Sequence, residues 1–153
     1  MKQGTDLDGL LGYQLLRSHM FVVDDARRSL VAHDITPAKL TALLLIRANP
    51  GCDQTALSRA LNMNRSSAMK LVNFLVDRGL VERRPGRDLR TNALHLLPGA
   101  DDRIREMVEA LSESDARTSA RLTQEERGQL FTLLRKLEPA RGRRLKEAAK
   151  ECR

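Results

Sequence analysis

Apolar residues recur at helical spacings of three, four and seven along the first part of the chain, from Leu7 to about Ala32. The pattern predicts one helix of about 26 residues, which is long for a globular protein. Its apolar positions exceed what one neighbouring helix covers, so we expect it to contact more than one partner, a second subunit among them.

The pattern changes at His33, and Thr36-Pro37 then has the residue types of a helix start, with Thr as N-cap and Pro in the first turn. The next helix, from Ala38 to Ala48, is almost wholly apolar and should form the buried centre of the fold. Asn49-Pro50-Gly51 is typical of a turn.

Two short helices follow, capped by Asp53 and Asn64, and the second runs to about Arg78, where Gly79 favours a chain reversal. In the shorter helix we expect Ala56, Leu57, Ala60 and Leu61 to face inward. The longer helix has an apolar face of Ala68, Leu71, Val72, Leu75 and Val76, opposite a polar face of Ser66, Lys70, Asn73 and Asp77.

Residues 80–84 and 91–97 have β character, and Pro85-Gly86 begins the turn between them. A fifth helix is expected to start at Pro98 and Gly99, and residues 112–120 suit either its continuation or a loop. Thr123 and Glu126 form a capping box that opens a sixth helix, which Pro139 ends. The predicted fold class is mainly α with a small β-wing, the layout of a winged helix-turn-helix.

Composition narrows the function classes. The chain is 41% hydrophobic and 31% charged, as in soluble globular proteins. Only 3% of residues are aromatic, which disfavours single-strand recognition by base stacking. No apolar run reaches membrane-spanning length, and no signal peptide pattern is present. Together with the use of only two cysteines, this predicts a cytoplasmic protein.

The net charge of +7 favours a polyanionic partner. Residues 83–90 hold four arginines and one aspartate, and residues 139–153 hold six basic and two acidic residues. The three histidines and two cysteines lack metal-ligand spacing, and no catalytic constellation is visible. We therefore expect no metal, no cofactor and no enzymatic activity.

The fourth helix has the residue types that a major groove accepts at its N-terminal end, namely Arg65, Ser66, Ser67 and Lys70. An ordinary solvated helix face has the same residues, so this helix alone does not distinguish a DNA-binding surface from a solvated one. The hairpin tip favours DNA binding, because Arg87 and Arg90 suit a narrow minor groove and Asp88 can orient Arg90 by accepting a hydrogen bond.

These residues resemble the multiple-antibiotic-resistance regulator (MarR) family, in Arg65-Ser66-Ser67, in the run from Arg78 to Arg84, and in Asp88-x-Arg90. The resemblance implies a single domain over 1–153, with dimerisation helices at 7–35 and 99–153 and a DNA-binding lobe at 36–98. It also implies a homodimer on a palindromic operator of double-stranded DNA. The expected DNA contacts are Gln54, Thr55, Asn64, Arg65, Ser66, Ser67, Lys70, Asn73, Arg84, Arg87, Asp88 and Arg90.

Regulators of this family often sense a small molecule. The stretch from Gly12 to His19 is similar to one found in members that bind aromatic carboxylates, which makes Tyr13, Arg17 and His19 candidate ligand contacts. Tyr13 and Arg17 share a helical face, and Arg17 suits a carboxylate. Alternatively, Tyr13 packs, Arg17 forms an intersubunit ion pair and His19 is a surface residue.

The sequence therefore predicts a ligand-responsive transcriptional repressor, released from its operator by an aromatic acid or its CoA thioester. One alternative is a winged-helix DNA-binding or architectural protein without an effector. A weaker one is a thiol-based redox sensor that uses Cys52. The basic tail after Pro139 is open to three roles: DNA contact, extension of the dimer, or disorder.

Overall fold

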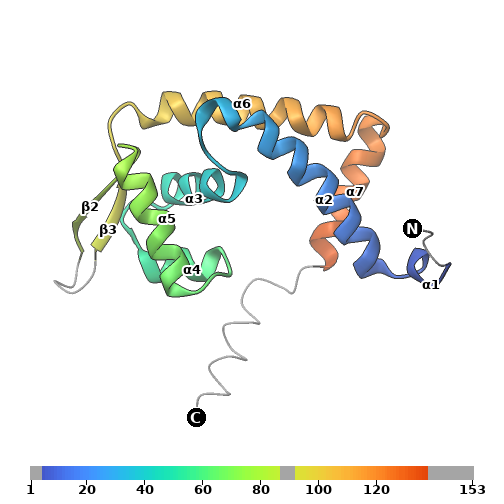
Figure 1. The fold of residues 1–153 in the computed structure, drawn as a ribbon, viewed down its shortest axis with the longest axis horizontal. Helices are drawn as coiled ribbons and strands as arrows, with labels where there is room; N and C mark the ends of the chain where they lie inside the picture. Colours follow the sequence, from blue (N-terminus) through green and yellow to red (C-terminus); the bar gives the residue numbers. More distant parts are fainter. Residues whose placement is uncertain (1–4, 87–91, 138–153) are drawn as a thin grey trace, which may run out of the picture. The chain divides into compact units, whose positions relative to one another are not determined.

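The computed structural model describes residues 5–86 and 92–137 (Figure 1). The chain forms two compact units, residues 1–115 and 116–153, and the boundary falls in the last turn of α6. The first unit contains α1 (Thr5–Asp8), α2 (Leu11–Ser29), the 3-10 turn η1 (Val31–His33), α3 (Pro37–Ala48), β1 (Cys52–Asp53), α4 (Gln54–Ala60), α5 (Arg65–Asp77), β2 (Val81–Pro85), β3 (Asn92–Leu96) and most of α6 (Ala100–Thr118). The second contains α7 (Gln124–Leu137).

The predicted single helix over residues 7–32 is wrong, because the helix is interrupted between α1 and α2. Leu10 is extended, with φ −90° and ψ 111°. Gly9 lowers helix propensity at this point. The side-chain amide of Gln14 donates to the carbonyl of Asp8 (2.9 Å), which satisfies one carbonyl group freed by the break. At the far end α2 stops at Ser29, and a 3-10 turn leads into α3.

The helix starts in the first unit follow the predicted caps. Thr36 Oγ1 accepts from the backbone N–H of Lys39 (3.4 Å), with Pro37 in the first turn of α3. Asp53 Oδ1 accepts from Ala56 N–H (2.7 Å) at α4. Gly79 has φ +63°, so it provides the left-handed conformation that reverses the chain after α5. Local capping chemistry therefore defines each of these boundaries.

The wing is part of a three-stranded antiparallel sheet in the order β1-β3-β2. β2 and β3 were predicted, but β1 was not. Cys52, which follows the predicted turn at residues 49–51, pairs with Leu94, and Asp53 pairs with Ala93. Pro98 and Gly99 precede α6 and do not begin it, while the helix continues through the ambiguous residues to Thr118.

The hydrophobic core of the first unit lies among α3, α5, α6 and the sheet. Its largest fully buried side chains are Leu30, Leu40, Leu43, Ile46, Leu57, Val72, Leu75, Leu80, Val81, Leu94, Ile104 and Met107. In α4 the buried face consists of Leu57 and Ser58, and Ala56 and Ala60 are exposed, which corrects the predicted inward set. Ser58 is accommodated because its hydroxyl donates to the carbonyl of Thr55 (2.9 Å). Within the described ranges no helix is long and apolar enough to cross a membrane.

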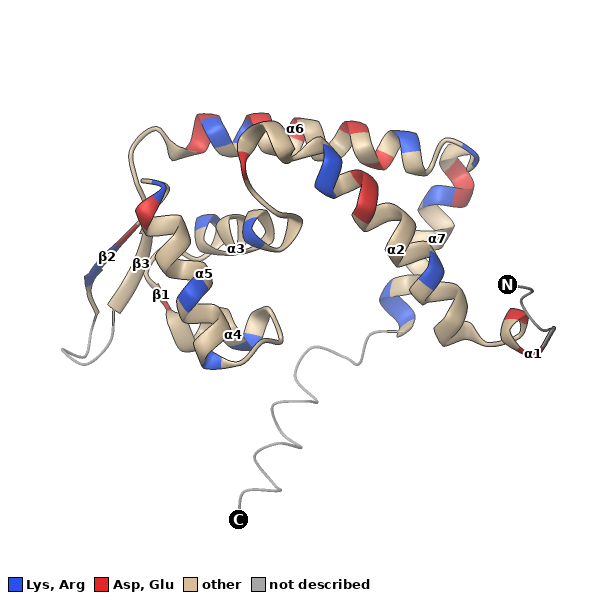
Figure 2. Ribbon diagram, viewed as in Figure 1, with Lys and Arg blue, Asp and Glu red and all other residues tan. Residues whose placement is uncertain are grey.

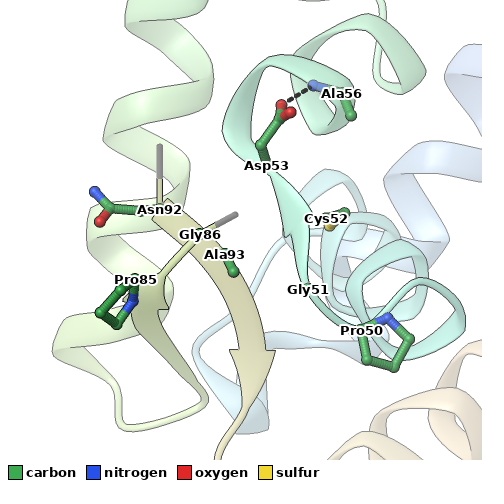
Figure 3. Close-up of a pocket in the computed structure, with 9 residues that line it drawn as sticks. All are labelled: Pro50, Gly51, Cys52, Asp53, Ala56, Pro85, Gly86, Asn92 and Ala93. Atoms are coloured by element: carbon green, nitrogen blue, oxygen red, sulfur yellow. Dashed lines mark hydrogen bonds between the residues drawn. The ribbon is translucent and has the colours of Figure 1, made fainter. Parts of the chain in front are cut away.

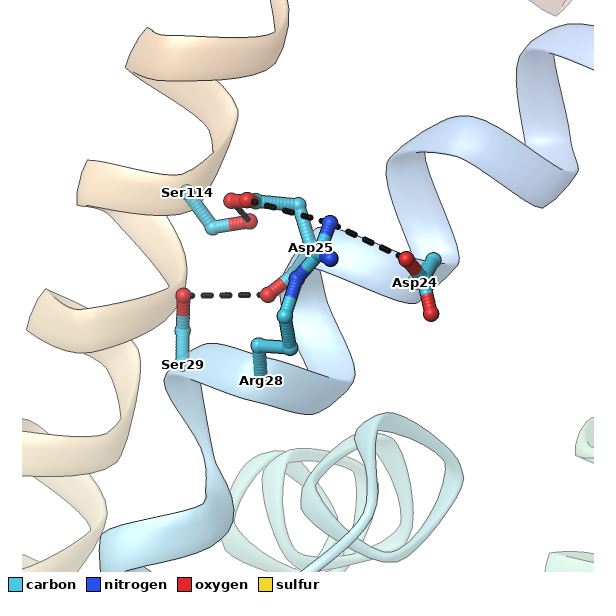
Figure 4. A network of polar contacts seen from close by, with 5 residues as sticks. All are labelled: Asp24, Asp25, Arg28, Ser29 and Ser114. Carbon is cyan, nitrogen blue, oxygen red and sulfur yellow. Dashed lines mark hydrogen bonds and ion pairs between the residues drawn. The ribbon is translucent and has the colours of Figure 1, made fainter.

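A polar network joins α2 to α6 (Figure 4). Ser114 is completely buried, and its hydroxyl donates to Asp25 Oδ2 (2.8 Å) across 89 positions of sequence. Arg28 contacts Asp24 at 3.0 Å and Asp25 at 3.9 Å. The hydroxyl of Ser29 donates to the carbonyl of Asp25 (3.1 Å). The network therefore fixes the C-terminal half of α2 against α6.

In the second unit, α7 begins with the predicted capping box. Glu126 N–H donates to Thr123 Oγ1 (3.2 Å), and Thr123 N–H donates to Glu126 Oε2 (2.8 Å). The hydrogen bond from Thr123 lowers the pKa of the Glu126 carboxyl. No residue of α7 is buried within the chain, and several of its large apolar side chains are exposed: Leu130, Phe131, Leu133 and Leu137.

Candidate nucleic-acid interface

Helices α4 and α5 form a helix-turn-helix in which Asp77, the last residue of α5, is the one acidic residue. Between Asp53 and Asp77 the chain has three basic residues, Arg59, Arg65 and Lys70, and no acidic one. Figure 2 shows these basic segments on α4 and α5 without red between them. Such a positively charged surface is complementary to the negative charge of a phosphate backbone.

The N-terminus of α5 presents the predicted polar residues to solvent. Arg65, Ser66, Ser67 and Lys70 are all exposed. Asn64 Oδ1 accepts from the N–H of Ser67 (2.8 Å) and from the hydroxyl of Ser66 (3.0 Å). The Asn64 carbonyl oxygen is therefore used in capping the helix, whereas Arg65 and Lys70 extend from the same end of the helix into solvent.

The first turn of α4 supports the same surface. Thr55 is exposed and Gln54 is partly exposed, so both predicted residues are accessible at this end of the helix-turn-helix. Arg59 is also exposed on α4. Sequence reasoning did not select Arg59, although the absence of acidic residues from this stretch was visible in the sequence.

Two further predicted residues are exposed but bind other side chains of the DNA-binding lobe. The Asn73 side-chain oxygen accepts from Arg83 Nη2 of β2 (2.6 Å). The guanidinium of Arg84 donates from Nε to Glu82 Oε1 (2.8 Å). Arg83, which was not selected from the sequence, is thus the arginine that β2 directs to α5. The predicted contacts Arg87, Asp88 and Arg90 lie outside the described residues, as does the basic tail.

Of the predicted ligand contacts, Tyr13 and Arg17 lie together on α2, with the guanidinium carbon 5.9 Å from the ring centre. His19 is also on α2, but it lines a separate hollow of about 510 Å³ between α2 and the start of α3. The hollow is lined by His19, Val23, Arg27, Thr36, Pro37, Ala38 and Thr41. Arg27 supplies its positive charge, and the structure does not include Tyr13 or Arg17 in this lining.

A second hollow, of about 500 Å³, lies beside β1 and the base of the wing (Figure 3). It includes Cys52, Asp53, Ala56, Pro85 and Ala93. Burial and the neighbouring Asp53 carboxylate raise the pKa of the Cys52 thiol. A raised pKa keeps the thiol protonated, which disfavours the redox alternative because the thiolate is the reactive form. In the described part of the chain no group of three His, Cys, Asp or Glu residues could hold a metal ion.

Comparison with known proteins agrees with this geometry. The family model described as MarR family matches residues 33–90. Over 131 residues the chain is 34% identical to a Thauera aromatica protein named as a transcriptional regulatory protein for the hcr operon, covering 84% of this chain and 79% of that protein. The chain belongs to the MarR family of transcriptional regulators.

Solved structures of MarR-family proteins share the fold. The transcriptional repressor CouR, bound to a 23-mer DNA duplex, is 27% identical with a TM-score of 0.84, covering 90% of this chain and 98% of CouR. The Mycobacterium tuberculosis MarR family protein Rv2887, in complex with salicylic acid, is 22% identical with a TM-score of 0.70, covering 85% and 97% of the two chains. At that identity the likeness to Rv2887 shows the fold alone.

Some residues of the site were not predicted from the sequence because they meet only in the folded chain. Arg27 and the start of α3 come together only when α2 packs on α3, and no local spacing in the sequence indicates that contact. Arg83 and Asn73 are ten residues apart on a strand and a helix. Alternation along β2 was the available signal, since it places Arg83 and Arg84 on opposite faces.

Proposed function

We propose that this MarR-family protein is a repressor that binds a palindromic operator as a homodimer, and that a small aromatic acid or its CoA thioester releases it. The observation that carries the proposal is the absence of acidic residues from positions 54–76 of α4 and α5, with Arg65 and Lys70 exposed in the N-terminal half of α5. A helix end of this kind places donors at base edges and phosphates.

Exposed apolar side chains on two helices support a homodimer. On α2 they include Leu11, Leu15, Leu16, Met20 and Phe21. On α7 Leu133 and Leu137 are more than half exposed. Large apolar side chains exposed in such number on one helix mark interaction sites. In the proposed dimer these helices pack against the partner and set the separation of two α5 helices at about 34 Å, one turn of DNA.

The hollow between α2 and α3 supports an effector. Arg27 offers a positive charge for a carboxylate, His19 offers a hydrogen-bond partner, and Val23, Pro37 and Ala38 offer apolar contact. This combination of a few polar groups with apolar walls is typical of ligand sites. The salicylic acid complex of Rv2887 makes salicylate the first probe. A coupling free energy of about 1–3 kcal/mol would change DNA affinity about 5- to 150-fold.

DNA binding is tested by selecting bound duplexes from a random-sequence pool with the full-length protein, and by sedimentation of the recovered complex. We expect an inverted repeat with half-sites about 10 base pairs apart, bound by two protomers. Recovery of duplexes without any shared sequence, or of a monomer on DNA, would contradict the proposal.

Effector binding is tested by the shift in thermal unfolding midpoint with salicylate, benzoate and benzoyl-CoA, followed by their effect on DNA affinity. A ligand that binds the folded protein at about 100 times its Kd adds about 2.7 kcal/mol of stability. Arg27→Gln should abolish the shift. Arg28→Gln is the matched control, since Arg28 pairs with Asp24 and does not line the hollow. No shift with any probe, despite operator binding, would favour a regulator without an effector.

A further inference from the structure

Two consecutive arginines of β2 have different partners. Arg83 donates to the side-chain oxygen of Asn73 on α5 (2.6 Å), whereas Arg84 donates to the carboxylate of Glu82 in its own strand (2.8 Å). Alternation along the strand explains the difference, because residues two apart share a face and neighbours do not. Arg83 therefore points toward α5, and Arg84 points away from it.

The two contacts affect the charges of the two arginines differently. Glu82 offsets the charge of Arg84 through an ion pair. Asn73 is neutral, so Arg83 keeps its full positive charge while its position is fixed. A guanidinium has five N–H donors, and this contact uses one of its nitrogen atoms, so donors remain for a second acceptor.

The position of Asn73 connects this charge to the DNA-facing surface. Asn73 and Lys70 are three residues apart on α5, so they share a face of the helix, and both are exposed. Arg83 is thus brought from the wing strand to the polar face of α5, which carries Lys70 before Asn73 and Asp77 after it.

We propose that Arg83 is a phosphate contact of this regulator, that Asn73 is a positioning residue which holds it there, and that Arg84 does not contact DNA. The inference rests on the proposed DNA-binding function and revises two contacts predicted from the sequence, Asn73 and Arg84. Phosphate contacts fix the orientation of a protein on DNA and carry no sequence information. Arg83 thereby fixes how α5 and the wing sit together on the duplex.

The first experiment measures the salt dependence of binding to a mixed-sequence 23-mer duplex, the length bound by CouR. Loss of one phosphate contact lowers the slope of log K against log salt by about 0.9 for each protomer. We expect this change for Arg83→Gln, and Arg83→Lys should keep the wild-type slope because the charge remains. Arg84→Gln is the matched control, since it removes the same charge from the neighbouring position.

The slopes decide the assignment. Equal slopes for Arg83→Gln and Arg84→Gln would overturn the inference, because they would indicate only a general effect of net charge. A wild-type slope in Arg83→Gln would overturn it as well. If the wild-type protein does not bind duplex DNA at all, the proposed function itself fails, and that outcome is distinct from both. Far-UV circular dichroism of each variant verifies folding.

The second experiment tests the role of Asn73 with a double-mutant cycle on the operator recovered by selection. Asn73→Ala should weaken binding about 2- to 10-fold, the cost of ordering a free arginine side chain on binding. If Asn73 acts through Arg83, the double variant Asn73→Ala/Arg83→Gln binds as well as Arg83→Gln alone. Additive losses would show that Asn73 contacts DNA independently and would overturn its role as a positioning residue.

Discussion

Replacing Ser114 by Ala tests the polar link between α2 and α6. Ser114 is completely buried, and its hydroxyl donates to a carboxylate oxygen of Asp25 at 2.8 Å. The substitution removes one oxygen atom and leaves the backbone and the helix propensity favourable. Its effect therefore comes mainly from the lost hydrogen bond.

The magnitude follows from the surroundings of Asp25. A hydrogen bond to a charged group contributes about 1.5–3 kcal/mol. The side chain of Asp25 is 21% exposed and keeps Arg28 at 3.9 Å, so water and the guanidinium partly compensate the carboxylate. We expect the lower end, about 1.5 kcal/mol. For a chain of this length the unfolding midpoint should then fall by about 3–6 °C.

The assay is thermal and urea unfolding at matched protein concentrations, followed by circular dichroism. Ser112→Ala is the control on the same helix, because Ser112 is exposed and its hydroxyl donates only to the carbonyl of Val108 among the contacts described for it. That control should change stability by less than about 0.5 kcal/mol. Equal effects of the two substitutions would refute the idea that the Ser114–Asp25 contact stabilises the packing of α2 on α6.

Two other predictions concern helix capping. Asn64→Ala removes the cap of α5 and should cost about 1 kcal/mol in urea unfolding, whereas Asn64→Ser should retain most of the stability; equal losses would argue against the capping role. The lowered pKa of Glu126 means that its contribution to stability is present above the ordinary pKa of a glutamate and is lost as pH falls through the lowered value. An NMR titration should place the Glu126 midpoint below that of an unstructured glutamate, mainly because the backbone N–H of Thr123 donates to the carboxylate. Thr123→Ala should raise the midpoint only in part, since it removes the hydroxyl and keeps this N–H; a wild-type midpoint equal to that of an unstructured glutamate would contradict the capping box.

The elements that the sequence predicted well depend on local chemistry. Asp53 and Asn64 cap helices through bonds to N–H groups three residues ahead. The apolar face of α5 follows from its periodicity, and Ala68, Leu71, Val72 and Leu75 are buried as expected. In each case the interacting residues lie within one or two helical turns, so the sequence contains the whole interaction.

The elements that it did not predict depend on distant partners. β1 is two residues long and exists because Cys52 and Asp53 pair with β3. The hollow that contains His19 and Arg27 requires α2 to pack on α3. The break at Gly9 was within reach of local reasoning, but continuous apolar spacing across it favoured one long helix. The Arg83 and Asn73 contact needs both the strand register and the position of α5.

That register has a consequence for how the wing can vary during evolution. Arg83 pairs across the sheet with Leu94, and Arg84 pairs with Ala93. A one-residue insertion or deletion within β2 would reverse the faces, turning Glu82 or Arg84 toward α5 and Arg83 away from it. Changes of two residues would restore the same faces. Among descendants of this gene, length changes in this strand should therefore occur in even steps.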